Sequence, residues 1–161
     1  MIMGSRPGHP PSRAAQTKSK AEVDVMFERI LLSVDGSEHA KRAGEITADL
    51  AALVGASVTV AHVQDMPKAW AIDFDPTVAW SDSEIVDDVV RDLKDRGIDA
   101  IGEVRLPRTS VAREIIDLAG EIDASLIVMG TRGLSDGEAL FLGSVSHKVA
   151  HLARCPVMFV R

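Results

Sequence analysis

The stretch RILLSVDGSEHA, residues 29–40, changes character twice within a few residues. It opens with an apolar run over 29–34, typical of a strand that is covered on both faces of a sheet. The run ends at Asp35-Gly36-Ser37, which has the composition of a tight turn followed by a helix cap. The stretch therefore predicts a strand that feeds directly into a helix, the unit from which parallel sheets are built.

The same alternation continues along the chain. Further apolar runs at 58–63, 125–129 and 157–160 predict buried strands, and the polar-apolar alternation of 102–106 predicts an edge strand with one wet face. With helix-length segments between them, the order βαβαβαβαβ predicts a parallel sheet that is covered by helices on both faces.

Four segments between these strands have helical spacing. In the first, which Gly55 ends, apolar residues recur at Ala43, Ile46, Leu50 and Leu53. The second follows a long connection over 65–80 and starts at a capping box, Ser81 to Glu84, with Val86, Val89, Val90 and Leu93 facing inward. The third starts at Ser110 and carries Val111, Ile115, Leu118 and Ile122; the last runs from about Ser144 to Ala153, before Pro156.

Length and composition limit the classes of protein. With 161 residues we expect one domain over 27–161, preceded by a flexible leader over 1–26 that is rich in Pro, Ser and Arg. The net charge of -6 argues against nucleic-acid binding, and no stretch approaches the roughly 20 apolar residues of a membrane span. Cys155 is the only cysteine, so no internal disulfide is possible, which fits the cytoplasm.

Chemistry is expected where the first and fourth strands end, because ligands of parallel sheets bind outside the carboxyl ends of strands. The first strand delivers Asp35, and the fourth delivers Gly130-Thr-Arg-Gly133, then nine residues, then Gly143-Ser144 at a helix start. Glycines and unpaired helix amides suit phosphate oxygens, with Ser144 and Ser146 as hydroxyl donors and Arg132 as a cation. Asp35 suits ribose hydroxyls or a metal that bridges phosphates.

The same residues also fit ordinary loop glycines, a helix cap and a β–α turn. A GxxG pattern is weak alone, and neither the lysine-bearing P-loop nor GxGxxG occurs in the chain. Spacing by itself leaves phosphate binding and a purely structural role open.

The chain from Phe27 to Arg161 resembles the universal stress protein family. The resemblance rests on ILLSVDGSEHA at 30–40, VAHV and its aspartate at 60–65, IVMGTRG at 127–133, LGSVSHKVAHLA at 142–153 and CPVMFV at 155–160. ATP-binding members of the family carry Gly, two residues, Gly, nine residues, then Gly and Ser or Thr. Gly130, Gly133, Gly143 and Ser144 match this spacing.

The resemblance implies an α/β three-layer sandwich of the adenine nucleotide alpha hydrolase-like type, with a five-stranded parallel sheet of order 3-2-1-4-5. It implies ATP, with or without Mg²⁺, as ligand: Asp35 at the ribose, the Val63 backbone at the adenine, and the glycines with Ser144 at the phosphates. Ser33 and Val34 would line the adenosine pocket. The implied nucleotide-binding residues are Ser33, Val34, Asp35, Val63, Met129, Gly130, Arg132, Gly133, Gly143, Ser144, Val145 and Ser146.

Other reactive residues favour structural roles. His147 and His151 lie one helical turn apart without a third metal ligand, and we expect surface histidines rather than a metal site. His62, inside an apolar run, is expected to be a hydrogen-bonded structural residue, and Cys155 to be buried and inert. Asp35 as a phosphorylated aspartate of a receiver domain is less favoured, because the acidic cluster and later lysine of such domains cannot be placed here.

The sequence thus predicts a cytoplasmic module that binds ATP or a related adenine nucleotide in a stress response. An apolar terminal strand, Val157 to Val160, at a sheet edge predicts a homodimer across that edge, which the family resemblance also implies. The alternative is that the leader or a loop covers this edge. No nucleophile with a general base is found, so catalysis has little support beyond slow, incidental ATP hydrolysis. Two alternatives are a nucleotide-free dimeric interaction protein, which the acids at 136 and 138 favour, and a protein that binds another phosphorylated small molecule.

Overall fold

The computed structural model describes residues 26–64, 76–131 and 142–161, with the backbone alone for 76–82. The strands in these ranges are β1 (Arg29–Ser33), β2 (Ser57–Val63), β3 (Ala100–Arg105), β4 (Leu126–Gly130) and β5 (Val157–Val160). They form one sheet of order β3-β2-β1-β4-β5, and every pair of neighbours is parallel. The predicted fold class and strand order are confirmed.

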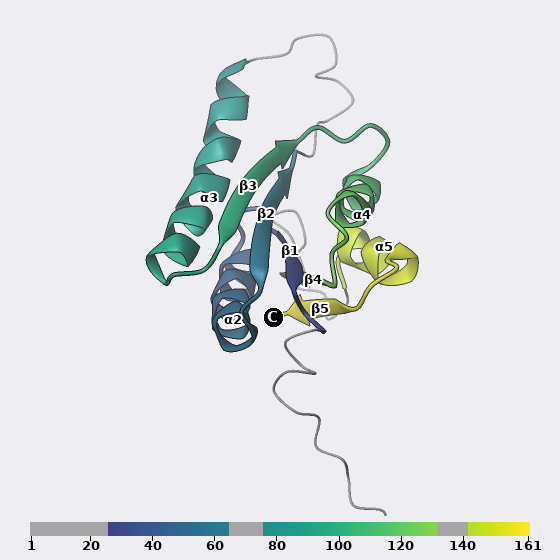
Figure 1. Ribbon diagram of the computed structural model, residues 1–161. Coiled ribbons are helices and arrows are strands. Elements are labelled where there is room, and N and C mark those ends of the chain that lie inside the picture. Colours follow the sequence, from purple (N-terminus) through teal and green to yellow (C-terminus); the bar gives the residue numbers. More distant parts are fainter. Residues whose placement is uncertain (1–25, 65–75, 132–141) are drawn as a thin grey trace, which may run out of the picture.

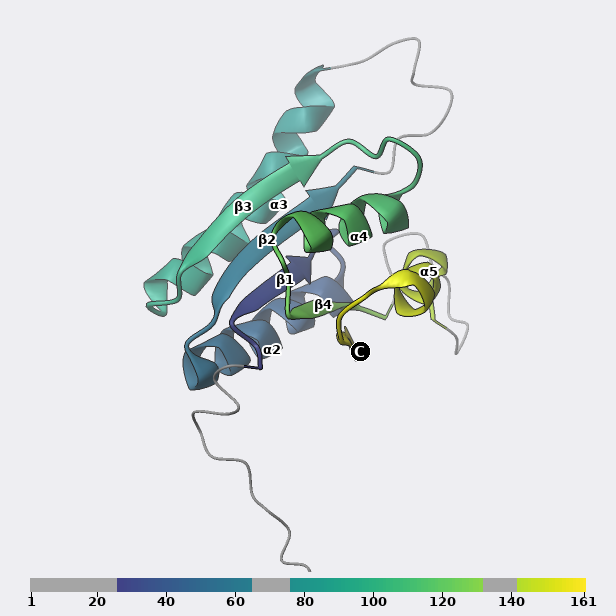
Figure 2. The same ribbon diagram turned by 45° about the vertical axis from the view of Figure 1, so that its right-hand side comes forward.

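Helices cover both faces of this sheet. The helices α2 (Glu38–Val54) and α3 (Pro76–Asp95) lie on one face, and α4 (Val111–Glu121) and α5 (Ser144–Leu152) lie on the other (Figure 1, Figure 2). Successive strand residues therefore enter different cores: Ile30 and Leu32 pack under α2 and α3, whereas Leu31 packs under α4 and α5. Two covered faces explain why the central strands read as unbroken apolar runs.

The helix α2 packs on the sheet through small residues. Its buried positions include Ala40, Ala43, Ala48 and Ala51, while the larger Ile46 and Leu53 are 43% and 66% exposed. Alanine side chains let a helix approach a sheet closely, so the large apolar residues that predicted this helix lie at its flank. Of the apolar positions that predicted the helix, Ala43 is buried and Leu50 packs partly against the core.

The prediction that the next helix opens at a capping box on Ser81 is wrong. The helix α3 begins at Pro76, so residues 76–80 of the predicted connection are helical. Proline is tolerated in a first helical turn because its missing N–H has no partner there. The inward residues are confirmed, with Val86 and Leu93 buried, and Val86 packs so closely that a Cβ on Gly102 would lie 2.4 Å from its Cγ1.

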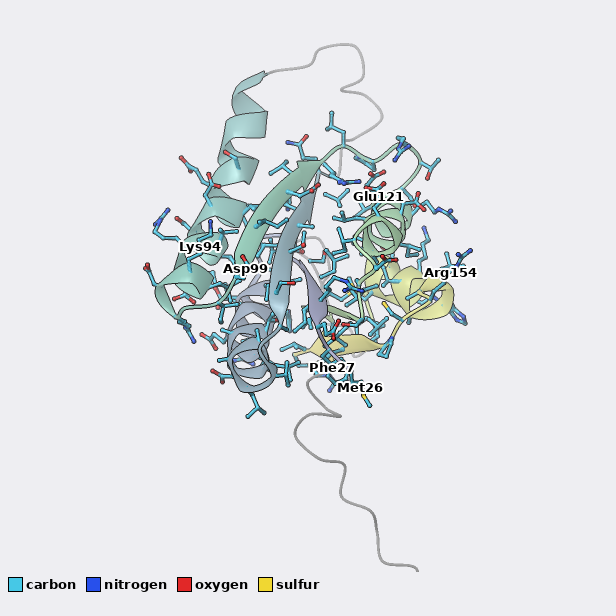
Figure 3. The ribbon with its side chains drawn as sticks, in the orientation of Figure 1. Met26, Phe27, Lys94, Asp99, Glu121 and Arg154 are labelled. Atoms are coloured by element: carbon cyan, nitrogen blue, oxygen red, sulfur yellow. The ribbon has the colours of Figure 1, made fainter. Side chains whose placement is uncertain are left out.

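Several local predictions are confirmed. Ser37 and Ser110 cap α2 and α4 with their hydroxyls, and Gly55 ends α2 in the left-handed conformation, with φ of 75°. The strands β3 and β5 are the two edges of the sheet. Met26 and Phe27 lie just before β1, and Phe27 packs against the core (Figure 3). Predictions for the leader before Met26, and for 65–75 and 132–141, lie outside the described residues.

Within the described ranges, no helix combines the length and apolar character needed to cross a membrane.

Candidate functional site

The strands β1 and β4 form the point where the chain order of the sheet reverses. The chain leaves β1 through α2 toward β2 on one side, and β4 pairs with β1 on the other side. Ser33 lies opposite Met129 in this pair, so Asp35 and Gly130 leave the sheet at neighbouring strand ends. The structure thus brings together the two segments that the sequence singled out, at the edge where parallel sheets bind ligands.

Asp35 sits in a tight turn between β1 and α2. Its Oδ1 accepts a hydrogen bond from the Ser37 amide at 3.0 Å. Gly36 has φ of 78°, and a Cβ there would lie 3.3 Å from Cδ1 of Ile85 on α3, so both conformation and space favour glycine. Among the described residues Oδ2 of Asp35 accepts no hydrogen bond, which leaves this oxygen available to a ligand.

Among the described residues, no side chain caps the start of α5. Gly143 is its N-cap residue, whereas α2 and α4 are capped by the hydroxyls of Ser37 and Ser110. The intrahelical bonds begin with the His147 amide, which donates to Gly143 O at 2.9 Å. The amides of residues 144–146 therefore have no partner within the helix and carry the positive end of its dipole.

Gly143 is not required by its own conformation. Its φ of -62° and ψ of 162° are open to any residue, and Gly130 lies within the strand β4. Glycine instead leaves position 143, directly before the first amides of α5, and position 130, at the end of β4, without a Cβ. This pattern fits a backbone that a ligand must approach closely.

Hydrogen bonds hold the end of β4 and the start of α5 together. The Gly143 amide donates to Thr131 O at 2.9 Å, and the Thr131 amide donates to Val160 O at 2.8 Å. The Ser146 hydroxyl donates to Gly130 O at 3.0 Å, and this side chain is only 3% exposed. The Ser146 hydroxyl therefore joins α5 to β4 inside the protein. Ser144, at the start of the same helix, is exposed.

Thr131 has a structural role that the sequence reading did not assign. Its backbone joins β5 to the start of α5, and the residue is buried. A hydroxyl residue directly after an apolar strand was the one available signal, and such residues are common wherever a strand ends.

The remaining predicted residues contribute mainly backbone atoms to this edge. Val34 is buried in the core under α2 and α3, while Val63 and Met129 are buried in the core under α4 and α5. Ser33 is half-buried, and Val145 packs partly against the second core. Arg132 and Gly133, with Asp136 and Glu138, lie outside the described residues.

His62 is a hydrogen-bonded structural residue, as predicted. Its ring is 8% exposed, and its Nδ1 lies 2.8 Å from Val34 O. His147 and His151 are exposed on α5 with their rings edge to face, 4.8 Å between centroids. Across the described ranges, no three His, Cys, Asp or Glu side chains gather as a metal site. Cys155 is half-buried, and this burial raises the pKa of its thiol.

An ion-pair network joins β3 to α4 at the same edge of the sheet. Arg105, which lies opposite Val63 in the β2–β3 pair, contacts three carboxylates: Glu121 at 2.8 Å, Glu103 at 2.9 Å and the buried Glu114 at 3.5 Å. The hydrogen bond from Arg105 lowers the pKa of Glu121, which Figure 3 shows on α4. The network fixes the connection between β3 and α4 beside the end of β2.

A family model and the relatives found by sequence comparison indicate the same protein family for this chain. Residues 26–161 match the model of the Universal stress protein family. The chain is 34% identical over 147 residues to a universal stress protein of Thermus aquaticus, and 30% identical over 150 residues to the universal stress protein YxiE of Bacillus subtilis. Each alignment covers 84% of this chain and 100% of the relative.

Solved structures with a similar fold include members of the same family. A universal stress protein family member from Burkholderia pseudomallei has a TM-score of 0.65 at 28% identity, with 84% of this chain and 96% of that chain covered. Two more distant structures, both at 24% identity, share the fold: one from Archaeoglobus fulgidus in complex with dAMP, with a TM-score of 0.67, and one in complex with cAMP, with a TM-score of 0.58. They cover 84% of this chain and, respectively, 99% and 97% of their own. From Met26 to Arg161, the chain belongs to the universal stress protein family.

Proposed function

We propose that this chain binds ATP, or a related adenine nucleotide, at the carboxyl edge between β1 and β4, and acts as a regulatory module in a stress response. The observation that carries the proposal is the uncapped start of α5 at Gly143, held by Thr131 beside the strand end that delivers Asp35. A helix start whose first amides have no partner among the described residues is suited to phosphate oxygens, and a neighbouring carboxylate is suited to sugar hydroxyls.

The phosphates would lie over the first turn of α5. The amides of Ser144 and Val145 would donate to phosphate oxygens, and the exposed Ser144 hydroxyl would add a further donor. The family spacing assigns Gly133 to the same cradle, with Arg132 as a nearby cation. Mg²⁺ would be carried by the phosphates, with no dedicated protein cage.

The nucleoside would lie over the ends of β1 and β2. The free Oδ2 of Asp35 would accept a ribose hydroxyl, and the backbone of Val63 would contact the adenine edge. The complexes of similar folds with dAMP and cAMP support adenine nucleotides as the ligand class. With no nucleophile and base placed at the edge among the described residues, the site is built for binding, and any ATP hydrolysis would be slow.

The module would act as a cytoplasmic homodimer. The strand β5 is an edge of the sheet, and its residues Val157, Met158 and Phe159 are only partly buried. Pairing of Val157–Val160 with a second copy would satisfy the edge backbone and cover these side chains.

The proposal can be tested on purified protein. Heat denaturation and chromatography of the supernatant would reveal co-purified nucleotide, and calorimetric titration of the apo protein with ATP and Mg²⁺ would give the affinity. Gly143→Val places a side chain over the free amides and should abolish binding. Gly120→Ala is the control, because a Cβ there meets nothing within 4 Å. Absence of bound nucleotide together with a Kd weaker than about 1 mM, or about 4 kcal/mol of binding free energy, would contradict the proposal.

The second candidate is a nucleotide-free interaction protein. Exposed leucines on the helices that contact β5 favour it: Leu53 on α2 is 66% exposed and Leu152 on α5 is 54% exposed. If ATP does not bind, light scattering on Leu53→Glu and Leu152→Glu would show whether these side chains hold an assembly together.

A further inference from the structure

His62 lies directly beneath the turn that carries Asp35. It is on β2, on the same face of the strand as the buried Val58 and Val60, which is the face covered by α2 and α3. Its Nδ1 is 2.8 Å from Val34 O. A carbonyl oxygen can only accept, so Nδ1 carries the hydrogen and donates it.

This hydrogen bond and one backbone hydrogen bond together hold the amide nitrogen and the carbonyl oxygen of Val34. The Val34 amide donates to Ala61 O at 2.9 Å, and Val34 O accepts from the next residue of β2, His62. Val34 O belongs to the peptide group that ends at the Asp35 nitrogen. Because a peptide group is planar, holding this oxygen holds the plane from which Asp35 starts.

The Asp35 carboxylate is then oriented by its own turn. Its Oδ1 accepts from the Ser37 amide at 3.0 Å, so the direction of Oδ2 depends on the peptide planes on both sides of Asp35. Ser37 is fixed on one side as the N-cap of α2. On the other side, the described side chain that bonds to the Val34–Asp35 peptide is His62.

We propose that His62 is a positioning residue of the nucleotide site, which acts through Val34 O to hold the Asp35 carboxylate toward the ribose. The part of this inference that concerns the ribose rests on the proposed function. The part that concerns the turn does not, and can be measured without ligand.

Two substitutions separate positioning from simple stability. His62→Leu keeps an apolar side chain of similar reach and removes the donor, so that Val34 O loses its partner. His62→Asn keeps a donor, because the asparagine Nδ2 and the histidine Nδ1 occupy equivalent positions along the side chain. Val60→Ala is the matched control, because it opens a cavity on the same strand, in the same core beneath α2 and α3, and leaves the hydrogen bond from His62 to Val34 O in place.

The first readout is amide hydrogen exchange in the apo protein, followed by NMR at a temperature where all variants stay folded. His62→Leu should accelerate exchange of the Ser37 amide by about 10-fold or more, which corresponds to about 1.4 kcal/mol of lost local stability. The Ser57 amide, which donates to Glu28 O at the opposite end of β2, serves as internal reference. His62→Asn should leave Ser37 exchange near the parent value.

The second readout is the affinity for ATP under the same conditions. We expect a loss of about 10-fold or more in His62→Leu, less than about 3-fold in His62→Asn, and none in Val60→Ala. Equal Ser37 exchange in His62→Leu and Val60→Ala would overturn the inference, as would ATP affinity that falls equally in these two variants. If the parent itself does not bind ATP, the proposed function fails and Ser37 exchange alone decides whether His62 positions Asp35.

Discussion

The two serines at the start of α5 provide a sharp test of how this edge is built. Ser146 donates its hydroxyl to Gly130 O inside the protein, whereas Ser144 is exposed beside the free amides of the helix start. Removal of the two hydroxyls should therefore have opposite consequences. Ser146→Ala should reduce stability, and Ser144→Ala should reduce nucleotide affinity.

The magnitude for Ser146→Ala follows from its surroundings. A buried hydrogen bond of 3.0 Å is lost and the Gly130 carbonyl keeps one partner fewer, which together cost about 1–2 kcal/mol. The exposed Ser144 makes no such bond to any described residue, so its substitution should change the free energy of unfolding by less than about 0.5 kcal/mol. Loss of one hydroxyl donor to a phosphate should weaken ATP binding by about 3- to 10-fold.

Urea denaturation measures the free energy of unfolding of each variant. It is done on the apo proteins at one fixed protein concentration, because bound nucleotide or a change in dimerisation would alter apparent stability. Titration with ATP measures the nucleotide affinity. A Ser146→Ala protein of parental stability that has lost ATP binding would contradict this assignment, because the Ser146 hydroxyl would then bind the ligand and not hold α5 to β4.

Three further results are expected. Gly102→Ala should lower the free energy of unfolding, measured in urea, by about 1–3 kcal/mol, because the new Cβ overlaps Val86. Adding Val86→Ala should restore part of the loss, which a change in strand propensity alone would not explain. Arg105 lowers the pKa of Glu121, so this pair stabilises the fold above the unfolded pKa of about 4.3 and loses its effect as pH falls through the lower folded value. Arg105→Met should therefore flatten the decline of stability on acidification below about pH 4.5. An unchanged slope would contradict the role of the pair. Cys155 should react with a thiol reagent at pH 8 more slowly than free cysteine, because burial raises its pKa, and equal rates would show that the thiol is exposed.

The sequence predicted the architecture because the signals that carry it are local and repeated. Apolar runs long enough for strands, separated by helical spacing, leave few arrangements other than a parallel sheet covered on both faces. The serine caps at Ser37 and Ser110 and the glycine at Gly55 follow from chemistry within one helical turn. Asp35 and Gly130 were brought together by the strand order that the family resemblance implied.

The features that the sequence did not predict depend on tertiary contacts. The apparent capping box at Ser81 lies within α3, because the helix begins at Pro76, a residue that a first helical turn tolerates. The hydrogen bond from the Ser146 hydroxyl to Gly130 O joins α5 to β4, and the spacing of the sequence does not predict it. The convergence of Glu103, Glu114 and Glu121 on Arg105 joins two elements whose pairing no local pattern encodes.

The most direct test of the central claim is an NMR titration of isotope-labelled apo protein with ATP and Mg²⁺. We predict that the largest amide shifts fall on Asp35, Gly143, Ser144 and Val145, at the carboxyl edge between β1 and β4, and that they saturate with the calorimetric affinity. Shifts confined to another surface, or no shifts at millimolar ATP, would contradict this prediction and direct attention to the terminal edge strand and to the exposed leucines of α2 and α5.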